Sequence, residues 1–136
     1  MNYLIEALLV GVNALLVYLV LQDFIHESVL LLLLVGFFKY LLGHLFSLHD
    51  YYCNNGNACI LLHKKDGKFI STSENLIRNS ILEGLYFVIL SYLYFRYEND
   101  YYARAIFIFL LGTIKHIIFE FAGVNSKFCV DSCKKL

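Results

Sequence analysis

One apolar segment of this chain, residues 103–123, carries ionisable side chains in its second half. They are Lys115, His116 and Glu120. A charge inside a lipid bilayer costs roughly 2.5 to 3.5 kcal/mol on insertion scales, so such side chains face other helices or water rather than acyl chains. The segment therefore predicts a bundle of helices that covers these groups.

Three further segments have the same apolar character, and each approaches the roughly 20 residues that a membrane-spanning helix needs. The expected helices are residues 3–22, 28–48, 76–95 and 103–122. Buried helices of a soluble core are the alternative. They would leave too little polar sequence to cover that core, because 60% of the 136 residues are hydrophobic. We expect an all-α membrane protein with four transmembrane helices in one bundle.

Polar stretches divide the chain into four parts. Residues 1–48 and 76–123 each hold two expected helices, and a short link between helices makes them antiparallel neighbours. Residues 49–75 form a central loop that contains cysteines, and residues 124–136 form a tail rich in cysteine and lysine. The expected fold is therefore two antiparallel transmembrane hairpins.

The central loop contains an Asp-Gly dipeptide between two β-prone runs, residues 58–63 and 68–72. This pattern signals a hairpin, because Gly accepts the positive φ of the turn. We expect a small β-hairpin here, whose exposed edges would suit strand addition by a partner. The surface expected to contact that partner carries Lys64, Lys65, Asp66 and Lys68.

The two halves of the chain resemble each other. The run that ends at Gly11 resembles the run that ends at Gly84, and three residues then recur with the same spacing. These are Gly36, Lys39 and Cys53 in the first half and Gly112, Lys115 and Cys129 in the second. A duplication would give a parallel repeat of two-helix units, although apolar sequence also produces such matches by chance.

Lysine and arginine are unequally divided between the two sides of the expected bundle. The side that holds both termini and the central loop carries seven of them, whereas the other side carries only Arg96 and Arg104. Because these residues concentrate in cytoplasmic loops, we expect both termini on the cytoplasmic side.

Several ionisable side chains lie within the expected helices. Glu83 and Lys115 are expected partners, since each lies seven residues from the cytoplasmic end of its helix, roughly 10 Å deep. Glu120, one turn beyond His116, is expected to pair with it or to reach the headgroups. This set of intramembrane polar residues has two possible roles, which are structural pairing between helices and a path for protons or ions. Its members are Glu6, Lys39, Glu83, Lys115, His116 and Glu120.

Four cysteines lie just outside the expected helices, at Cys53, Cys59, Cys129 and Cys133. They could bind Zn²⁺ through four thiolates, although their spacing is not typical of zinc sites. They could also form two disulfides with three possible connectivities, or remain free buried thiols. Cytosol normally keeps thiols reduced, so disulfides conflict with the expected cytoplasmic side.

Two segments around these cysteines resemble a known group of proteins. They are residues 44–59, which begin HLFSLHDYYC, and residues 116–129, HIIFEFAGVNSKFC. Both are similar to segments of small multi-pass membrane proteins encoded by nucleocytoplasmic large DNA viruses. The resemblance implies a protein of the internal virion membrane, under an icosahedral capsid. It also implies a viral thiol oxidation machinery, which would allow disulfides on a cytoplasm-derived face.

The expected function is that of a structural membrane protein of the virion, which joins the lipid bilayer to capsid or scaffold proteins and is compatible with a homo-oligomer. We expect no enzymatic activity, no cofactor and no nucleic-acid partner. A membrane thiol oxidoreductase is one alternative, but the chain lacks the usual Cys-x-x-Cys pair. A small ion-coupled or proton-coupled transporter is the other.

Overall fold

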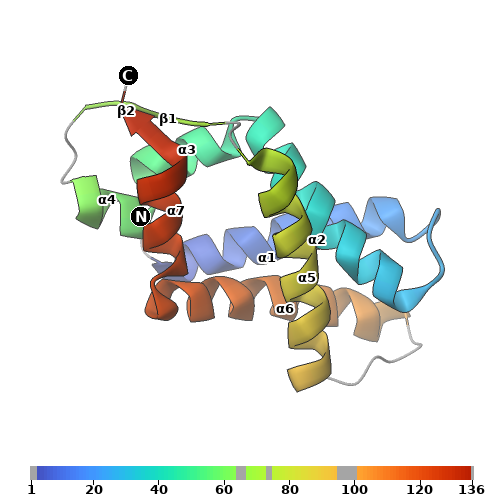
Figure 1. The fold of residues 1–136 in the computed structure, drawn as a ribbon. Coiled ribbons are helices and arrows are strands. Elements are labelled where there is room, and N and C mark those ends of the chain that lie inside the picture. The colour runs from blue at the N-terminus through green and yellow to red at the C-terminus, as the bar shows by residue number, and fades with distance from the viewer. Residues whose placement is uncertain (1–2, 64–66, 73–74, 95–100, 136) are drawn as a thin grey trace.

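A computed structural model describes residues 3–63, 67–72, 75–94 and 101–135 of the chain. Within these ranges the long helices are α1 (Tyr3–Leu21), α2 (Ser28–Leu45), α5 (Leu76–Tyr94) and α6 (Tyr101–Ala122). The short elements are α3 (Leu48–Asn55), α4 (Asn57–His63), β1 (Phe69–Ser71), α7 (Val124–Ser132) and β2 (Cys133–Lys135) (Figure 1). The described chain is therefore mostly helical, as expected.

Two described helices are long and apolar enough to cross a membrane. They are α1 and the Arg104–Ala122 part of α6. Helices α2 and α3 meet at a bend of 76° and make a third candidate span if the pair is counted as one. Of the four expected spans, the described residues thus support two or three by length and composition.

The long helices pack as two pairs, and each pair takes one helix from each half of the chain. Helix α1 lies antiparallel to α6, and α2 packs against α5, which crosses α6 in Figure 1. Apolar side chains form the core where the pairs meet, among them Tyr18, Val35, Phe87, Ile108 and Leu111. The two expected hairpins are therefore interlocked, since the most extensive contacts run between them.

Glycines let the helices of each pair approach closely. A Cβ atom on Gly36 would lie 2.6 Å from the Cα atom of Gly84, and one on Gly112 would lie 3.2 Å from the Cα atom of Gly11. Close backbone approach at small residues is a common way to associate helices in lipid. These contacts explain why each helix selects a partner from the other half.

Substitution of Gly84 by alanine is expected to destabilise the α2–α5 pair. The added Cβ atom would overlap the backbone carbonyl oxygen of Leu33, which cannot rotate away. Overpacking of this kind costs about 1 to 3 kcal/mol. Thermal unfolding in detergent measures the loss, with Leu85→Ala, at a position 42% exposed, as the control. Equal midpoints for the two variants would contradict the close approach.

The short elements gather at one end of the long helices and form a cap, which comprises residues 48–63, 67–72 and 124–135 (Figure 1). The cap has its own buried core, separate from that of the long helices. Its members are Cys53, Ala58, Cys59, Phe69, Cys129 and Cys133. The central loop and the tail thus fold together as one unit.

The prediction of a β-hairpin within the central loop is wrong. Residues 58–63, expected as its first strand, lie in α4, and β1 pairs antiparallel with β2 so that Ile70 lies opposite Lys134. Gly67 does have the positive φ of 89° that the Asp-Gly signal predicted. The partner strand comes from the tail because two disulfides hold the tail beside the central loop.

The outer edge of β1 is closed by side chains of α3. The side-chain amide of Asn54 bonds both the N–H and the carbonyl oxygen of Phe69, each at 2.8 to 2.9 Å. The carboxylate of Asp50 accepts a bond from the Ser71 N–H, which holds the pKa of Asp50 below its usual value. Strand addition at this edge, which the sequence suggested, would have to break these bonds.

Candidate functional site

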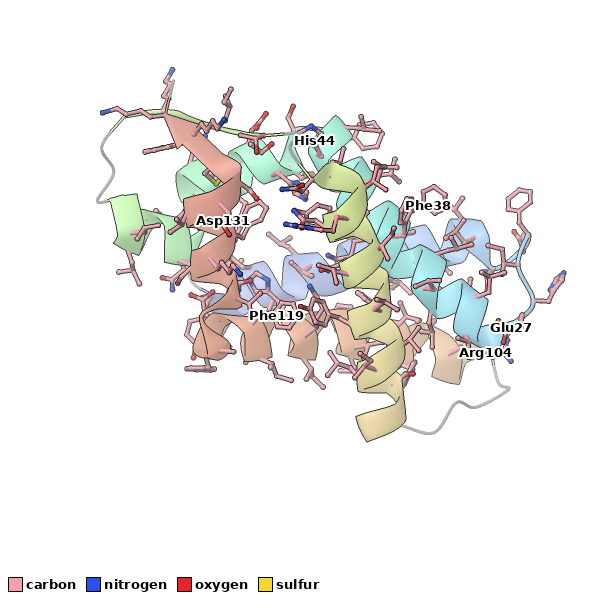
Figure 2. All side chains as sticks on the ribbon, in the orientation of Figure 1. Glu27, Phe38, His44, Arg104, Phe119 and Asp131 are labelled. Atoms are coloured by element: carbon pink, nitrogen blue, oxygen red, sulfur yellow. A yellow bond between two sulfur atoms is a disulfide. The ribbon has the colours of Figure 1, made fainter. Side chains whose placement is uncertain are left out.

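The long helices and the cap line a partly open cavity of about 640 Å³. Figure 2 shows side chains that project into the region between these helices and the cap. Its ionisable lining includes Glu6, Lys39, Glu83, Lys115 and His116. Its aromatic lining includes Tyr40, Tyr52, Tyr86, Phe119 and Phe128. The structure thus brings five of the six predicted intramembrane polar residues to one place.

Glu83 on α5 joins two lysines from different helices. Its Oε1 atom accepts hydrogen bonds from Lys39 Nζ on α2, at 2.9 Å, and from Lys115 Nζ on α6, at 2.5 Å. The three side chains are buried. The predicted Glu83–Lys115 pair is therefore present, and Lys39 adds a second cation. Because a buried charge without a partner is strongly destabilising, this triad ties α2, α5 and α6 together.

A second polar cluster lies where the ends of α1 and α6 meet the cap. Glu6 Oε2 lies 3.1 Å from His116 Nε2. Asn57 donates its backbone N–H to Glu6 and its side-chain amide to Glu120, the latter at 2.7 Å. Asn125 donates to the other oxygen of Glu120 at 2.9 Å. Glu120 is thus held by amides of the cap.

Sequence reasoning did not assign Asn57 and Asn125 to this cluster. Each lies in the first turn of a short cap helix, which the sequence did not predict. Only the folding of the cap onto α6 brings their amides to Glu120. The residues around Asn57 and Asn125 in the sequence do not indicate a contact with Glu120.

The four cysteines form two disulfides that join the central segment to the tail. Cys53 pairs with Cys133, with 5.7 Å between Cα atoms, and Cys59 pairs with Cys129, with 5.3 Å. No cysteine is free in the described chain. Of the three alternatives left open by the sequence, the structure has the disulfides.

The similarity of the two halves extends to these disulfides. In the alignment of the halves, Cys53 corresponds to Cys129, and Cys59 and Cys133 are each the second cysteine of their half. Exchange of the halves therefore converts one disulfide into the other. This relation supports the predicted duplication.

A backbone feature repeats in the same way. Ser47 and Gly123 both adopt a left-handed conformation, with φ of 61° and 80°, and each precedes a short cap helix. Ser47 lies eleven residues after Gly36, and Gly123 lies eleven residues after Gly112. A left-handed backbone conformation is unfavourable for serine. Its occurrence at the same position in each half is therefore further support for two equivalent halves.

His49 of α3 lies between aromatic rings at the cavity. Its ring centroid is 4.5 Å from that of Tyr40 and 5.5 Å from that of Phe128. Burial is the main cause that lowers the pKa of His49 from 6.5 to about 4; the nearby Lys39 and His44 act in the same direction, while Glu83 and Asp50 oppose it. The folded protein therefore keeps this imidazole neutral in mildly acidic solution.

The stability of the protein is expected to fall as the pH decreases from about 6.5 to about 4. In this range the unfolded chain binds a proton at His49 and the folded chain does not, so acid favours unfolding. Thermal midpoints in detergent between about pH 7 and about pH 4.5 measure the slope. His49→Gln should flatten it, whereas His26→Gln, which changes an exposed histidine, should not. Equal slopes in both variants would exclude His49 as a cause.

The remaining predicted site residues belong to the central loop. Lys68 is exposed on the cap beside β1, whereas Lys64, Lys65 and Asp66 lie outside the described residues. Comparison of the chain with family models, with curated proteins and with solved structures found no match. The chemistry of the cavity and the cap therefore carries the functional conclusion.

Proposed function

We propose that this chain is a structural integral membrane protein with four transmembrane helices, which anchors the internal membrane of a virion to capsid or scaffold proteins. The observation that carries the proposal is the disulfide-bonded cap at one end of an apolar helical body. Two disulfides between segments far apart in sequence make a rigid surface outside the lipid. Such a surface suits a fixed contact with a protein layer.

The outward faces of the long helices support the membrane part of the proposal. Exposed large aliphatic side chains on α1 and α5 have 40 to 64% of their surface accessible, among them Leu8, Leu16, Val20, Ile81 and Ile89. An apolar surface of this extent is unusual for a soluble monomer and suits acyl chains. The buried charged groups of the helices face one another instead, as the Glu83 triad does.

The placement of the chain ends supports one orientation for the cap. In Figure 1 the N-terminal and C-terminal ends both lie on the side of the cap. The cap also presents exposed basic residues, Lys68, Lys127 and Lys134. On this proposal the cap and both termini face the capsid. The resemblance to viral membrane proteins implies a viral thiol oxidation machinery, which would form the disulfides in a cytoplasm-derived compartment.

Fractionation of purified particles tests the proposal. We expect alkaline carbonate to leave the chain in the membrane, because its helices are inserted in lipid. We expect a nonionic detergent that extracts the lipid to leave the chain on the capsid shell, because the cap is bound there. Release by carbonate would contradict the membrane insertion. Extraction together with the lipid would contradict the anchoring role.

A matched variant isolates the contribution of the cap. Cys53→Ser with Cys133→Ser removes one disulfide without changing a helix that contacts lipid. This variant should stay in the membrane under carbonate but leave the shell with detergent. Retention on the shell at the level of the unchanged chain would place the anchoring contact outside the cap.

A second candidate function is proton-coupled or ion-coupled transport, which the cavity with its charged lining favours. The pairing of Glu83 with two lysines favours a structural role for the same residues. Reconstituted vesicles distinguish the two, since a proton flux that is lost in Glu83→Gln would establish transport. Thiol oxidoreductase activity is less favoured, because each of the four cysteines is at most 7% exposed.

A further inference from the structure

We propose that Glu6, His116 and Glu120 bind a divalent transition-metal ion of the class of Zn²⁺. One donor atom from each residue lies within 4.8 Å of the other two. Glu6 and His116 are buried, at 4 and 5% exposure, and Glu120 is partly buried. The proposal does not depend on the membrane-anchoring role.

The positions of the three residues bring their donor atoms together. His116 and Glu120 are four residues apart on α6 and therefore share one face of that helix. Helix α1 runs antiparallel to α6, so Glu6 in its first turn lies beside them. Ligands of a tetrahedral zinc ion are separated by roughly 3.4 Å, given metal–ligand distances near 2.1 Å. The 3.1 Å between Glu6 Oε2 and His116 Nε2 fits this separation, and a carboxylate oxygen of Glu120 lies within 4.8 Å of both donor atoms.

The chemistry of the donors favours a transition metal over calcium or magnesium. An imidazole nitrogen suits zinc and its neighbours, whereas calcium and magnesium prefer oxygen alone. Two carboxylates close together in a buried place also repel each other. A divalent cation would balance both charges.

Amides around the cluster orient the two carboxylates. Asn57 bonds Glu6 and Glu120, and Asn125 bonds the remaining oxygen of Glu120. Metal sites commonly depend on such outer partners, which hold the ligands in position. These bonds come from the cap, so the ion would link the cap to the ends of α1 and α6.

Tyr52 provides an independent observation at the same place. Its hydroxyl is buried and has no hydrogen-bond partner among the residues that the structure describes. Its ring centroid lies 6.0 Å from that of His116. A buried hydroxyl without a partner is unfavourable. A water in the fourth position of the metal would give it one.

Exchange of the two halves offers an internal comparison, because Glu6 lies in the first half and His116 and Glu120 lie in the second. The exchanged positions are Asn79, Tyr40 and His44, none of which is a carboxylate. Asn79 contacts the Tyr40 hydroxyl at 3.4 Å, as Glu6 contacts His116 at 3.1 Å. The exchanged place thus keeps the contact as a neutral pair, and of these six positions only Glu6 and Glu120 carry carboxylates.

Metal analysis of the purified full-length protein tests the site. The protein is kept free of affinity tags, with both disulfides intact, incubated with Zn²⁺ in detergent, and desalted. We expect about one Zn²⁺ per chain by inductively coupled plasma mass spectrometry, and a thermal unfolding midpoint that rises with the Zn²⁺ concentration. Glu120→Gln should weaken Zn²⁺ binding about 100-fold or more and abolish the rise in the midpoint. The control His26→Gln, at an exposed position, should bind as the unchanged protein does.

Two further measurements make each outcome decisive. Glu6→Gln provides a second ligand variant if Glu120→Gln does not fold, and the midpoint without Zn²⁺ shows whether each variant is folded. Co²⁺ in place of Zn²⁺ should give the weak visible bands of nitrogen and oxygen ligands. A sulfur-to-cobalt charge-transfer band, binding well below one ion per chain, or equal affinity in a folded ligand variant would overturn the proposal.

Discussion

Glu83→Gln is expected to lower the free energy of unfolding by about 3 to 5 kcal/mol, the cost of leaving buried charges without a partner. Glu83 is the counter-ion of both Lys39 and Lys115 among the described residues. With glutamine in its place, two ammonium groups on side chains that are at most 10% exposed would face each other without a counter-ion. Equilibrium unfolding by SDS in mixed micelles measures the change.

Two matched variants separate this cause from a general loss of acidic charge. Asp23→Asn removes an exposed carboxylate in the α1–α2 link and should change stability by less than about 0.5 kcal/mol. Replacement of the whole triad, by Glu83→Leu with Lys39→Met and Lys115→Met, should recover most of the loss, since apolar residues of similar size can replace buried ion pairs. A triple variant less stable than Glu83→Gln would show that the pairing itself supplies net stability.

Removal of both disulfides is expected to have a larger effect. Each closes a long loop, of 80 and 70 residues, and in the chain-entropy model one such loop contributes about 4 kcal/mol. The contributions are not additive. Once Cys53–Cys133 is formed, Cys59–Cys129 closes only a short ring, for which the same model gives about 3 kcal/mol.

Serine variants of each pair measure these differences. Either pair alone should cost about 3 kcal/mol, and both together about 7 kcal/mol, by unfolding in mixed micelles without reductant. The losses should fall on the cap, so amide hydrogen exchange should accelerate in α3, α4 and α7 before it does in α1 or α6. Uniform exchange along the chain would mean that the cap and the helices unfold as one unit. Wild-type stability without either disulfide would show that packing alone holds the cap.

Several features followed from the sequence alone. The apolar runs predicted the long helices, because the hydrophobic character of about twenty consecutive residues is a local property that needs no knowledge of the fold. The Glu83–Lys115 pair was predicted from the depth of each residue in its helix. The repeated spacing from glycine to lysine to cysteine likewise predicted two similar halves, which the exchanged disulfides support.

The errors concern contacts between distant segments. The Asp-Gly turn signal was locally correct at Gly67, but β1 has its partner at Lys134, far along the chain. A turn signal describes backbone conformation at a few residues, and it does not select a strand from another segment. The choice of helix partners was missed for the same reason, since Gly36 approaches Gly84 of the other half.

The sequence by itself determined which long segments of this protein are helical and apolar, and which of their side chains need a polar partner. Only the tertiary structure decided which residues are those partners. Lys39 pairs with Glu83, His116 pairs with Glu6, and the amides of the cap bond Glu120. The physical reason is that burial makes a partner obligatory for a charge but leaves its identity open. That identity depends on which backbones can approach one another, and here the glycines and the disulfides set that approach.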